Sequence, residues 1–500
     1  MKIVLVVPPK SHPHMRTLRD EICFQNVPYT PFPLRFAAVA PMLREAADVE
    51  IVDANALDWD WVRLERELPA ADLFVYKSAA GLIRGDSRVG EIVKRKFGRE
   101  AKVALVETTL APLYPERMLN DFTQIDFIVR GQVEVVLPAL ARGLREPGSV
   151  LGIAYRRDRE IAATPPAQPA PDLDSIPFMA YDLLPVDRYS ISYLAAPRYE
   201  RIVPGIRMRT TRDCPYLCPF CIIGTSVYRG YDRRWRSMSP ERVVAELEHV
   251  KNRHGVGNVF FWDETFTLDQ KRATRLCELM IERRLGMLWR CLTRMDCVSP
   301  ELLESMAGAG CRHIEYGLEA GDPESRAANH KNFGDDVVRR VVADTQAAGM
   351  AAHVDVIVGM PWETRETLDH TLHLINDLHA DNVHLTMAFP YPETEFYKTA
   401  EARGLLQFAD IYSLMIDERV RVGATPYVRS EALAPLELLA GWERIRRESD
   451  RHFFFHHVLL SPTTLLRYAR LCLNPHHLAQ ISRRAARSLR HLVPARASRR

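Results

Sequence analysis

The most informative stretch of this chain reads Asp213-Cys214-Pro215-Tyr216-Leu217-Cys218-Pro219-Phe220-Cys221. Its three thiols fall within eight residues and directly follow a predicted strand. Because the two prolines cannot continue a regular helix, the segment must form a loop. A loop can wrap three thiolates around one metal centre, and thiolates are the ligands that iron–sulfur clusters require. Cys214, Cys218 and Cys221 are therefore predicted to hold a [4Fe–4S] cluster with one iron open to a substrate.

Two other interpretations of the three cysteines stay open at this point. A zinc site needs four ligands, and no fourth Cys or His lies at suitable local spacing. The three residues could also be unligated core cysteines. The cysteines elsewhere in the same region lack cluster spacing and are predicted to be core thiols; they are Cys277, Cys291, Cys297 and Cys311.

Strands and helices alternate from about residue 205 to residue 400. Each of the sequences Ser239-Pro240-Glu241 and Ser299-Pro300-Glu301 predicts a helix start, with an N-cap hydroxyl, a proline at N1 and an early acid. Six strand–helix units predict a parallel, partial (β/α)6 TIM-like barrel over 205–400, with its chemistry at the carboxyl ends of the strands. The expected strands are Ile206–Thr210, Asn258–Trp262, Leu288–Thr293, His313–Tyr316, His353–Val358 and Val383–Met387.

Residues 1–145 show the same alternation in shorter units. Helical patterns such as Leu34–Ala47 and Arg88–Lys96 separate short apolar runs. This predicts a Rossmann- or flavodoxin-like doubly wound parallel sheet, and hence an α/β protein. Prolines at 165, 166, 169 and 171 then predict a linker over 146–204. The expected strands are Ile3–Val7, Val49–Val52, Leu73–Tyr76, Val103–Val106 and Ile125–Val129.

Residues 401–500 are predicted to form a helical, basic region. The last 18 residues carry seven arginines, and apolar residues interleaved with arginine can also lie at a membrane surface or contact a lipid. A helical appendage with a frayed basic tail is the favoured interpretation. The pairs His456-His457 and His476-His477 could bind a metal, but adjacent histidines on a helix point to different faces.

Composition excludes several classes of protein. A chain of 500 residues is too long for one core, and a net charge of +3 gives no reason to expect a nucleic-acid partner. No stretch approaches the roughly 18 apolar residues that span a membrane. The apolar run Lys2–Val7 is too short for a signal peptide, so a cytoplasmic protein with reduced thiols is expected.

The cysteine spacing C-x3-C-x2-C, with the aromatic Phe220 before the last cysteine, resembles the signature of the radical S-adenosylmethionine (SAM) superfamily. Later segments agree with that family in order. Ala320 and Trp362 stand where the family has a serine and a glycine, and a glycine is also missing from the last segment. The matching segments are Phe261–Phe266, Trp289 with Arg294 and Asp296, Ile314–Gly321, Gly359–Thr364 and Phe389–Thr394.

The resemblance implies a second cofactor, SAM, and the residues that would contact it. SAM would ligate the open iron and be cleaved to a 5′-deoxyadenosyl radical that abstracts hydrogen from carbon. Glu264 and Glu319 are acids that could receive the SAM ammonium or ribose hydroxyls. The cofactor-binding residues implied by the family motifs are Phe220, Asp263, Glu264, Arg294, Glu319, Gly359 and Glu363.

The first domain resembles the cobalamin-binding domain that precedes many radical SAM barrels, through Pro31–Ala40, Val52-Asp53-Ala54 and Phe127–Glu134. Two features depart from it. Val106–Ala111 replaces the glycine-rich turn that follows the fourth strand, where a corrinoid needs close backbone approach. A D-x-H-x-x-G motif is also missing, since Asp377-x-His379 lies in the barrel region and lacks the glycine. The alternative is a flavodoxin-like domain that no longer binds the cofactor.

These observations predict a cobalamin-dependent radical SAM C-methyltransferase that acts on an unactivated carbon of a small-molecule or lipid-like metabolite. One alternative is a radical cyclisation, rearrangement or oxidation, and another is a non-catalytic iron–sulfur protein. Methylthiotransferases are disfavoured because they need three cysteines in the first domain, where only Cys23 is present; Cys472 alone likewise disfavours an auxiliary cluster. A small, hydrophobic substrate and a flavodoxin- or ferredoxin-type reductant are the expected partners.

Overall fold

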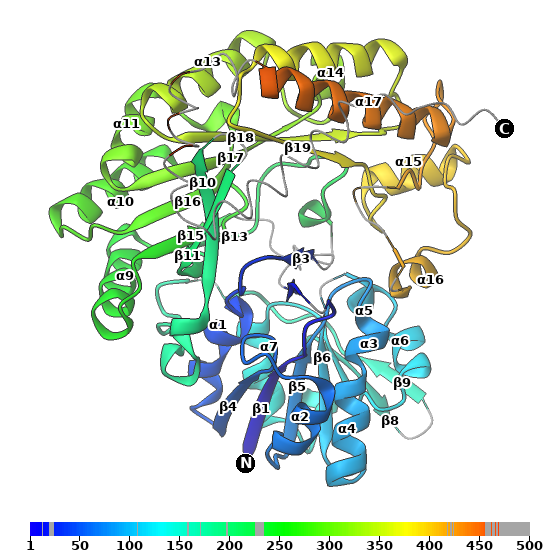
Figure 1. Cartoon of the computed structure of the whole chain (residues 1–500). Coiled ribbons are helices and arrows are strands. Elements are labelled where there is room, and N and C mark those ends of the chain that lie inside the picture. The colour runs from blue at the N-terminus through cyan, green and yellow to red at the C-terminus, as the bar shows by residue number, and fades with distance from the viewer. Residues whose placement is uncertain are drawn as a thin grey trace.

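A computed structural model of the chain has two α/β domains, the first below and the second above in Figure 1. It describes residues 1–455 except 13, 20–24, 108, 158–159, 171, 197–198, 226–234, 418, 421–422 and 424, and also residues 462, 466 and 469. Among the helices within these residues, none is both long enough and apolar enough to cross a membrane.

The first domain is built on a seven-stranded sheet in the order β4-β1-β5-β6-β7-β8-β9. The first five of these strands are parallel, and their order matches that of flavodoxin-like doubly wound folds. This confirms the predicted fold class, and each expected strand is found within two residues of its expected start. The strands are β1 (Lys2–Val7), β4 (Asp48–Asp53), β5 (Leu73–Lys77), β6 (Lys102–Val106), β7 (Phe127–Val129), β8 (Ile153–Arg157) and β9 (Glu160–Ala163).

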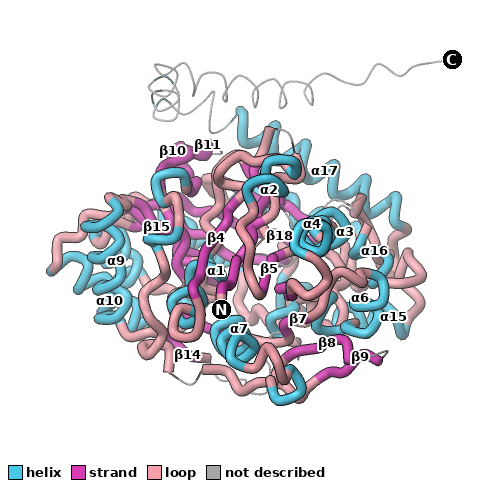
Figure 2. The backbone as a smooth tube through the Cα atoms, turned by 90° about the horizontal axis from the view of Figure 1, so that it is seen from below, coloured by secondary structure: helices cyan, strands magenta, loops and turns pink. Residues whose placement is uncertain are grey.

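Helices cover both faces of this sheet. The view from below places α1 and α7 on one side and α2, α4 and α6 on the other (Figure 2). Alternate residues of β1 explain this, because Ile3 and Leu5 pack in one apolar core and Val4 and Val6 in the other. The helices are α1 (Leu34–Leu43), α2 (Trp61–Glu67), α3 (Ile83–Asp86), α4 (Arg88–Phe97), α5 (Leu110–Leu113), α6 (Pro115–Asp121) and α7 (Val133–Arg142), and a hairpin of β2 (Arg16–Leu18) and β3 (Gln25–Val27) lies before α1.

The segment 146–204, expected as a linker, contains regular structure. β8 and β9 extend the first sheet with two antiparallel strands. Ile153 and Tyr155 of β8 are buried, and this burial favours a strand although prolines follow in the sequence. Residues 165–170, where three of the four prolines lie, form neither helix nor strand. A second hairpin, β10 (Ser190–Ala196) and β11 (Tyr199–Pro204), then precedes the barrel. The first sheet therefore extends to Ala163 rather than ending near residue 145.

The second domain has a six-stranded parallel sheet in the order β12-β15-β16-β17-β18-β19. The sheet is curved (Figure 1), and its outermost strands, β12 and β19, do not pair with each other. It is therefore an open, partial barrel, as predicted. The strands are β12 (Ile206–Met208), β15 (Asn258–Phe261), β16 (Leu288–Arg294), β17 (Cys311–Glu319), β18 (Ala351–Val358) and β19 (Asn382–Met387), and β13 (Thr211–Arg212) pairs with β14 (Arg236–Ser237).

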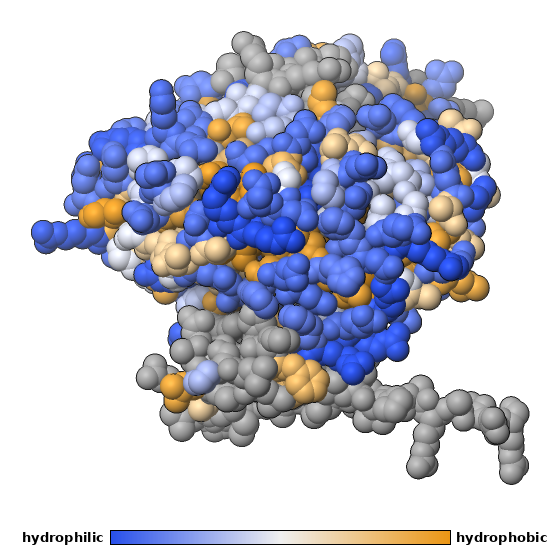
Figure 3. Space-filling model, turned by 90° about the horizontal axis from the view of Figure 1, so that it is seen from above, coloured by the Kyte–Doolittle hydropathy of each residue, from blue (hydrophilic) through white to orange (hydrophobic). Residues whose placement is uncertain are grey.

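Helices lie along the outside of this sheet (Figure 1). Ser239 and Ser299 cap two of them, as predicted, by accepting the backbone N–H groups of Arg242 and Leu302. The helix-covered upper face is mostly hydrophilic with scattered apolar residues, as expected of solvated helix surfaces (Figure 3). The helices are α9 (Pro240–His254), α10 (Gln270–Glu282), α11 (Pro300–Gly308), α12 (Pro323–Ala328), α13 (Asp335–Ala347) and α14 (Arg365–Asp377).

The region after the barrel returns to both domains. Its helices are α15 (Glu395–Ala402), α16 (Ile411–Ile416) and α17 (Pro435–Phe453), and α17 packs along α14. On α16, Tyr412 is buried in the core of the first domain, and Asp410 pairs with Arg117 of α6 at 2.7 Å. The arginine-rich tail, both histidine pairs, Cys23 and Cys472 lie outside the described residues.

Candidate active site

The cysteines lie on a loop, residues 213–221, that starts at the carboxyl end of the first barrel strands; we call it the cluster loop. Asp263, which follows β15, holds its start in place. Its carboxylate accepts the backbone N–H groups of Thr210 and Thr211, both at 2.7 Å, and their hydroxyls at 2.8 and 2.9 Å. All four donors come from the residues that lead to Cys214, so Asp263, expected to contact a cofactor, lies where it fixes the direction of the loop.

Further contacts fix the rest of the cluster loop. Asp213 pairs with Arg236 at 2.6 Å, and the backbone N–H of Phe396 donates to the carbonyl of Pro219 at 2.9 Å. Phe396 lies on α15, beyond the last strand, so the loop extends from the first strand of the barrel to the last. Phe220 adds an apolar contact at that edge, in a cluster with Met360, Trp362, Ala388, Phe396 and Leu405.

The three thiols are partly buried and lie in one neighbourhood. Burial raises the pKa of Cys214 and Cys218, and raises that of Cys221 to about 12. Backbone N–H groups of Tyr216 and Ile223 oppose this rise at Cys214 and Cys221. Without a metal the thiols are therefore protonated at neutral pH, and they become thiolates when a metal displaces the protons.

The three cysteine sulfurs can be compared with the ligand atoms around a single zinc ion. Four thiolates around one zinc ion, with bonds of about 2.3 Å, stand about 3.8 Å apart. Among the described residues, the groups of three ligand atoms within 4.8 Å of one another are two histidine–carboxylate groups, and the cysteines form no such group. In this structure the three cysteine sulfurs are therefore not gathered as closely as the ligand atoms of a single ion.

Two cations lie beside the triad. Arg294 places Nη1 3.9 Å from the sulfur of Cys218, stacks on the ring of Tyr216 at 3.7 Å, and pairs with Asp296 at 2.7 Å. Lys331 also lowers the pKa of Cys218 through its charge. Positive charges favour thiolates over thiols, so both residues stabilise a negatively charged centre here.

Glu319 lies close to the same triad, at the end of β17. Its charge contributes to the raised pKa of Cys218 and Cys221, and its carboxylate pairs with Lys331 at 3.3 Å. Burial raises the pKa of Glu319 itself, with Lys331 opposing. A Cβ atom on Gly317 would lie 2.3 Å from the Glu319 carboxylate, so a larger residue there would displace that side chain. The structure therefore brings together the triad, Arg294 and Glu319.

Gly359 and Glu363 form the turn between β18 and α14. Gly359 has φ +99°, which favours glycine, and a Cβ there would lie 2.8 Å from the sulfur of Met387. Its N–H donates to Glu363 at 3.0 Å, and Glu363 also accepts the hydroxyl of Thr367. Both residues, expected to contact a cofactor, therefore shape this turn from within.

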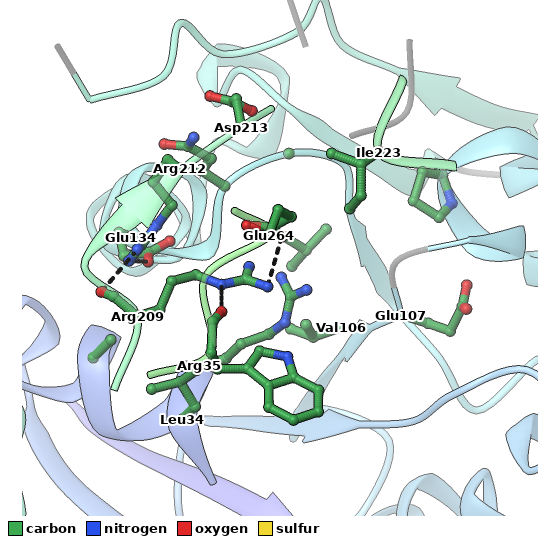
Figure 4. A pocket seen from close by; sticks show the side chains of 16 residues that line it. Leu34, Arg35, Val106, Glu107, Glu134, Arg209, Arg212, Asp213, Ile223 and Glu264 are labelled. Carbon is green, nitrogen blue, oxygen red and sulfur yellow. Dashed lines mark hydrogen bonds and ion pairs between the residues drawn. The ribbon is translucent and has the colours of Figure 1, made fainter. Parts of the chain in front are cut away.

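A cavity that is open to solvent lies between the two domains (Figure 4). Val106 and Val129, at the ends of β6 and β7, contribute from the first domain, and Arg209 and Glu264 from the second. Asp213 and Ile223, which lie just before and just after the three cysteines, also line the cavity. The full lining is Leu34, Arg35, Ala38, Val106, Glu107, Pro112, Val129, Gly131, Gln132, Glu134, Arg209, Arg212, Asp213, Ile223, Trp262 and Glu264.

Charged pairs from both domains project into this cavity (Figure 4). Arg212 bridges to Glu134 of α7 at 2.7 Å, and Arg209 pairs with Glu264 at 2.8 Å. Burial favours the neutral form of Glu134, but Arg212 outweighs it and lowers its pKa. Burial raises the pKa of Glu264, and its Oε2 atom has no hydrogen-bond partner within the part of the chain described. Such an atom is open to a donor from a bound molecule or from water.

The atypical turn Val106–Ala111 forms one wall of the cavity. Glu107 is buried, and its carboxylate accepts the backbone N–H groups of Thr109, Leu110 and Ala111 at 2.7–3.0 Å. Burial raises its pKa, and these three bonds oppose the rise. A carboxylate thus organises the turn that glycines form in the family pattern.

Several site residues were missed by the sequence reasoning. Arg209 and Lys331 lie outside the quoted motifs, and the pairing that makes them relevant is between distant segments. A set of inward-facing histidines on β17, β18 and β19 was also missed, although each lies at an alternate position of a predicted strand. The four other cysteines are buried, as expected: Cys277, Cys291, Cys297 and Cys311.

Comparisons with known proteins match both domains. The model of the radical SAM superfamily matches residues 208–375. An uncharacterized methyltransferase of Pyrococcus horikoshii is 29% identical over 412 residues, which are 81% of this chain and 84% of that protein. The anaerobic magnesium-protoporphyrin IX monomethyl ester cyclase of Rubrivivax gelatinosus is 28% identical over 362 residues, which are 70% of this chain but only 60% of the cyclase.

A solved structure shares the two-domain fold. The radical SAM methyltransferase TsrM from Kitasatospora setae, with cobalamin and a [4Fe–4S] cluster bound, aligns with a TM-score of 0.62 at 19% sequence identity. The alignment covers 82% of this chain and 76% of TsrM, so it extends beyond the barrel.

Proposed function

The chain belongs to the radical SAM superfamily, and on this premise we propose that it is a cobalamin-dependent C-methyltransferase. Its substrate is a small molecule of hydrophobic character, methylated at an unactivated carbon. The observation that carries the proposal is the cavity between the domains. It is lined by Asp213 and Ile223, on either side of the triad, and by the carboxyl ends of β6 and β7. Two cofactors bound at these positions would face one space.

The cluster loop supplies the ligands for the first cofactor. Cys214, Cys218 and Cys221 would hold three irons of a [4Fe–4S] cluster, leaving the fourth for SAM. Glu319, beside the triad, is the carboxylate placed to receive the SAM ammonium or ribose hydroxyls. When bound, cluster and SAM supply a 5′-deoxyadenosyl radical, with electrons from a flavodoxin- or ferredoxin-type protein. The protein's own task is to orient SAM and balance charge.

The cavity has the mixed lining that a corrinoid needs. Apolar side chains such as Val106 and Val129 would face the ring, and Arg35 and Glu264 would pair with its amide side chains. The unpartnered Oε2 of Glu264 is an acceptor for such an amide. A bound corrinoid supplies a carrier for the methyl group. Glu107 takes the place of a glycine-rich turn on this wall.

Anaerobic reconstitution with iron, sulfide and cobalamin tests the assignment. The wild type is expected to retain one cobalamin per chain after gel filtration. Ala38→Phe, which fills the cavity from α1, should lose most of it, whereas Ala139→Phe on the outer side of α7 should not. Retention of cobalamin by Ala38→Phe, or its absence from the wild type at full cluster content, would contradict the assignment.

A second reaction is supported by the relation to the cyclase. The same cofactors could serve a radical cyclisation, rearrangement or oxidation without methyl transfer, since the Rubrivivax relative is a cyclase. Mass spectrometry of the product with methyl-labelled SAM separates the two. Methyl transfer adds the label to the product, and the alternative leaves the product unlabelled.

A further inference from the structure

Five ionisable side chains lie at alternate positions of neighbouring strands on the inner face of the barrel. They are His313 and Glu315 on β17, His353 and Asp355 on β18, and His384 on β19. The strand register pairs Glu315 with His353 and Asp355 with His384. Residues at alternate positions of neighbouring strands share one face, so this arrangement follows from the parallel sheet. Of the five, only Glu315 lies within a segment that resembles the family motifs, Ile314–Gly321.

His313 packs beside these residues but is not placed to bind a metal ion. The backbone N–H of Leu194 donates to its Nδ1 atom at 3.3 Å, so the proton of the neutral ring is on Nε2. The ring stacks on His353 with centroids 5.5 Å apart. A ring with one nitrogen accepting and the other protonated has no lone pair for a metal.

The other two histidines converge on one carboxylate. His384 Nδ1 lies 3.1 Å from Asp355 Oδ1, and His353 Nε2 lies 3.5 Å from the same oxygen. One ligand atom from each of the three residues lies within 4.8 Å of the others. Ligand atoms around a tetrahedral ion with bonds of about 2.0–2.2 Å stand roughly 3.3–3.6 Å apart. We propose that His353, Asp355 and His384 bind one divalent transition-metal ion.

The surroundings fit a metal ligand set. The Nδ1 atom of His353 lies 3.4 Å from the side-chain amide of Asn382 and 3.9 Å from Glu315, and Glu315 is paired with Arg290. A carboxylate behind a ligating histidine is the usual second partner that fixes the ring. Two imidazoles and one carboxylate are a ligand set for zinc or ferrous iron.

The site has an open side. The side chain of His384 is 56% exposed and that of Asp355 is 32% exposed, whereas His353 is 9% exposed. Three protein ligands with free coordination positions are typical of sites that bind water or a substrate rather than of closed structural sites. The ion would thus face the inside of the barrel, where a small molecule with an oxygen or nitrogen donor could bind it. On the proposed function, that molecule is the substrate.

Zinc binding by the full, cluster-loaded chain tests the site. Zinc is added anaerobically, excess is removed, and bound zinc is quantified and examined by zinc X-ray absorption. The wild type is expected to hold one zinc with nitrogen and oxygen ligands at about 2.0–2.2 Å, not sulfur at about 2.3 Å. His384→Ala and Asp355→Asn should each weaken binding at least tenfold. His370→Ala, a histidine beside Asp335 on the outside of the barrel, is the matched control and should bind normally.

The outcomes separate cleanly. The inference is overturned if the wild type binds no zinc, binds it only through sulfur, or binds it equally well in both site variants. Iron content and 5′-deoxyadenosine formation are measured on the same samples. A chain that binds zinc as expected but forms no 5′-deoxyadenosine would refute the proposed function and leave the metal site standing.

Discussion

Asp263→Asn is the substitution that best tests how the cluster loop is positioned. The carboxylate accepts the N–H groups of Thr210 and Thr211, and an asparagine keeps its shape but not its charge. A hydrogen bond to a charged group contributes about 1.5–3 kcal/mol and a neutral one about 0.5–1.5 kcal/mol, a difference of roughly 1 kcal/mol per bond. The two backbone bonds together therefore lose about 2 kcal/mol, which corresponds to roughly 30-fold in an opening equilibrium.

Hydrogen exchange of the peptide around residues 208–214 measures this opening. Thr210 and Thr211 amides should exchange roughly 30-fold faster in Asp263→Asn, and the iron content after reconstitution should fall with them. Asp269→Asn is the control, since the Asp269 carboxylate accepts the N–H of Arg272 at the start of α10, away from the cluster loop. Unchanged protection of residues 210–211 together with unchanged iron content would show that Asp263 does not position the loop.

Two further predictions concern Glu319 and two glycines at the end of α11. Burial raises the pKa of Glu319, so its folded form binds a proton more tightly than its unfolded form; the stability it contributes is fully present below its unfolded pKa and is lost as pH rises through its folded value. The melting temperature of wild type minus that of Glu319→Gln should therefore decline as pH rises above about 4.5, and a flat difference from pH 4 to 8 would contradict this. Gly310 has φ +102°, and a Cβ there would lie 2.1 Å from the carbonyl oxygen of Met287, so Gly310→Ala should destabilise the chain by about 1–3 kcal/mol or more. Gly308→Ala meets only Ile281 at 3.6 Å and should be neutral or stabilising in the same urea unfolding assay; equal effects of the two would refute the strain.

The strands and the cluster loop could be predicted because local patterns determine them. Apolar runs such as Lys2–Val7 are buried wherever the sheet forms, and two prolines make 213–221 a loop in any context. The strands β8 and β9 could not be predicted in the same way. Ile153 and Tyr155 are short apolar signals beside a proline-rich segment, and only pairing with β7 makes them strands.

The site was predictable where a motif names the residue and not where distant segments pair. The triad, Arg294 and Glu319 come together as the motif order implies. Asp263 and Glu363 carry the expected residue types, yet the Asp263 carboxylate bonds to the residues that lead into the cluster loop and the Glu363 carboxylate bonds within its own turn. Whether such a carboxylate contacts a cofactor or a backbone N–H group depends on which groups the fold places near it. The spacing of residues in the sequence does not specify this. The same holds for His353, Asp355 and His384, which meet only through strand register.

The amount of 5′-deoxyadenosine formed per reconstituted cluster tests the central claim most directly. Under an anaerobic reductant, the wild-type chain with cluster and SAM is expected to form it, and Cys218→Ala, which removes one cluster ligand, is expected to form none. A chain with a full cluster that forms no 5′-deoxyadenosine would contradict the account and would favour a non-catalytic iron–sulfur protein.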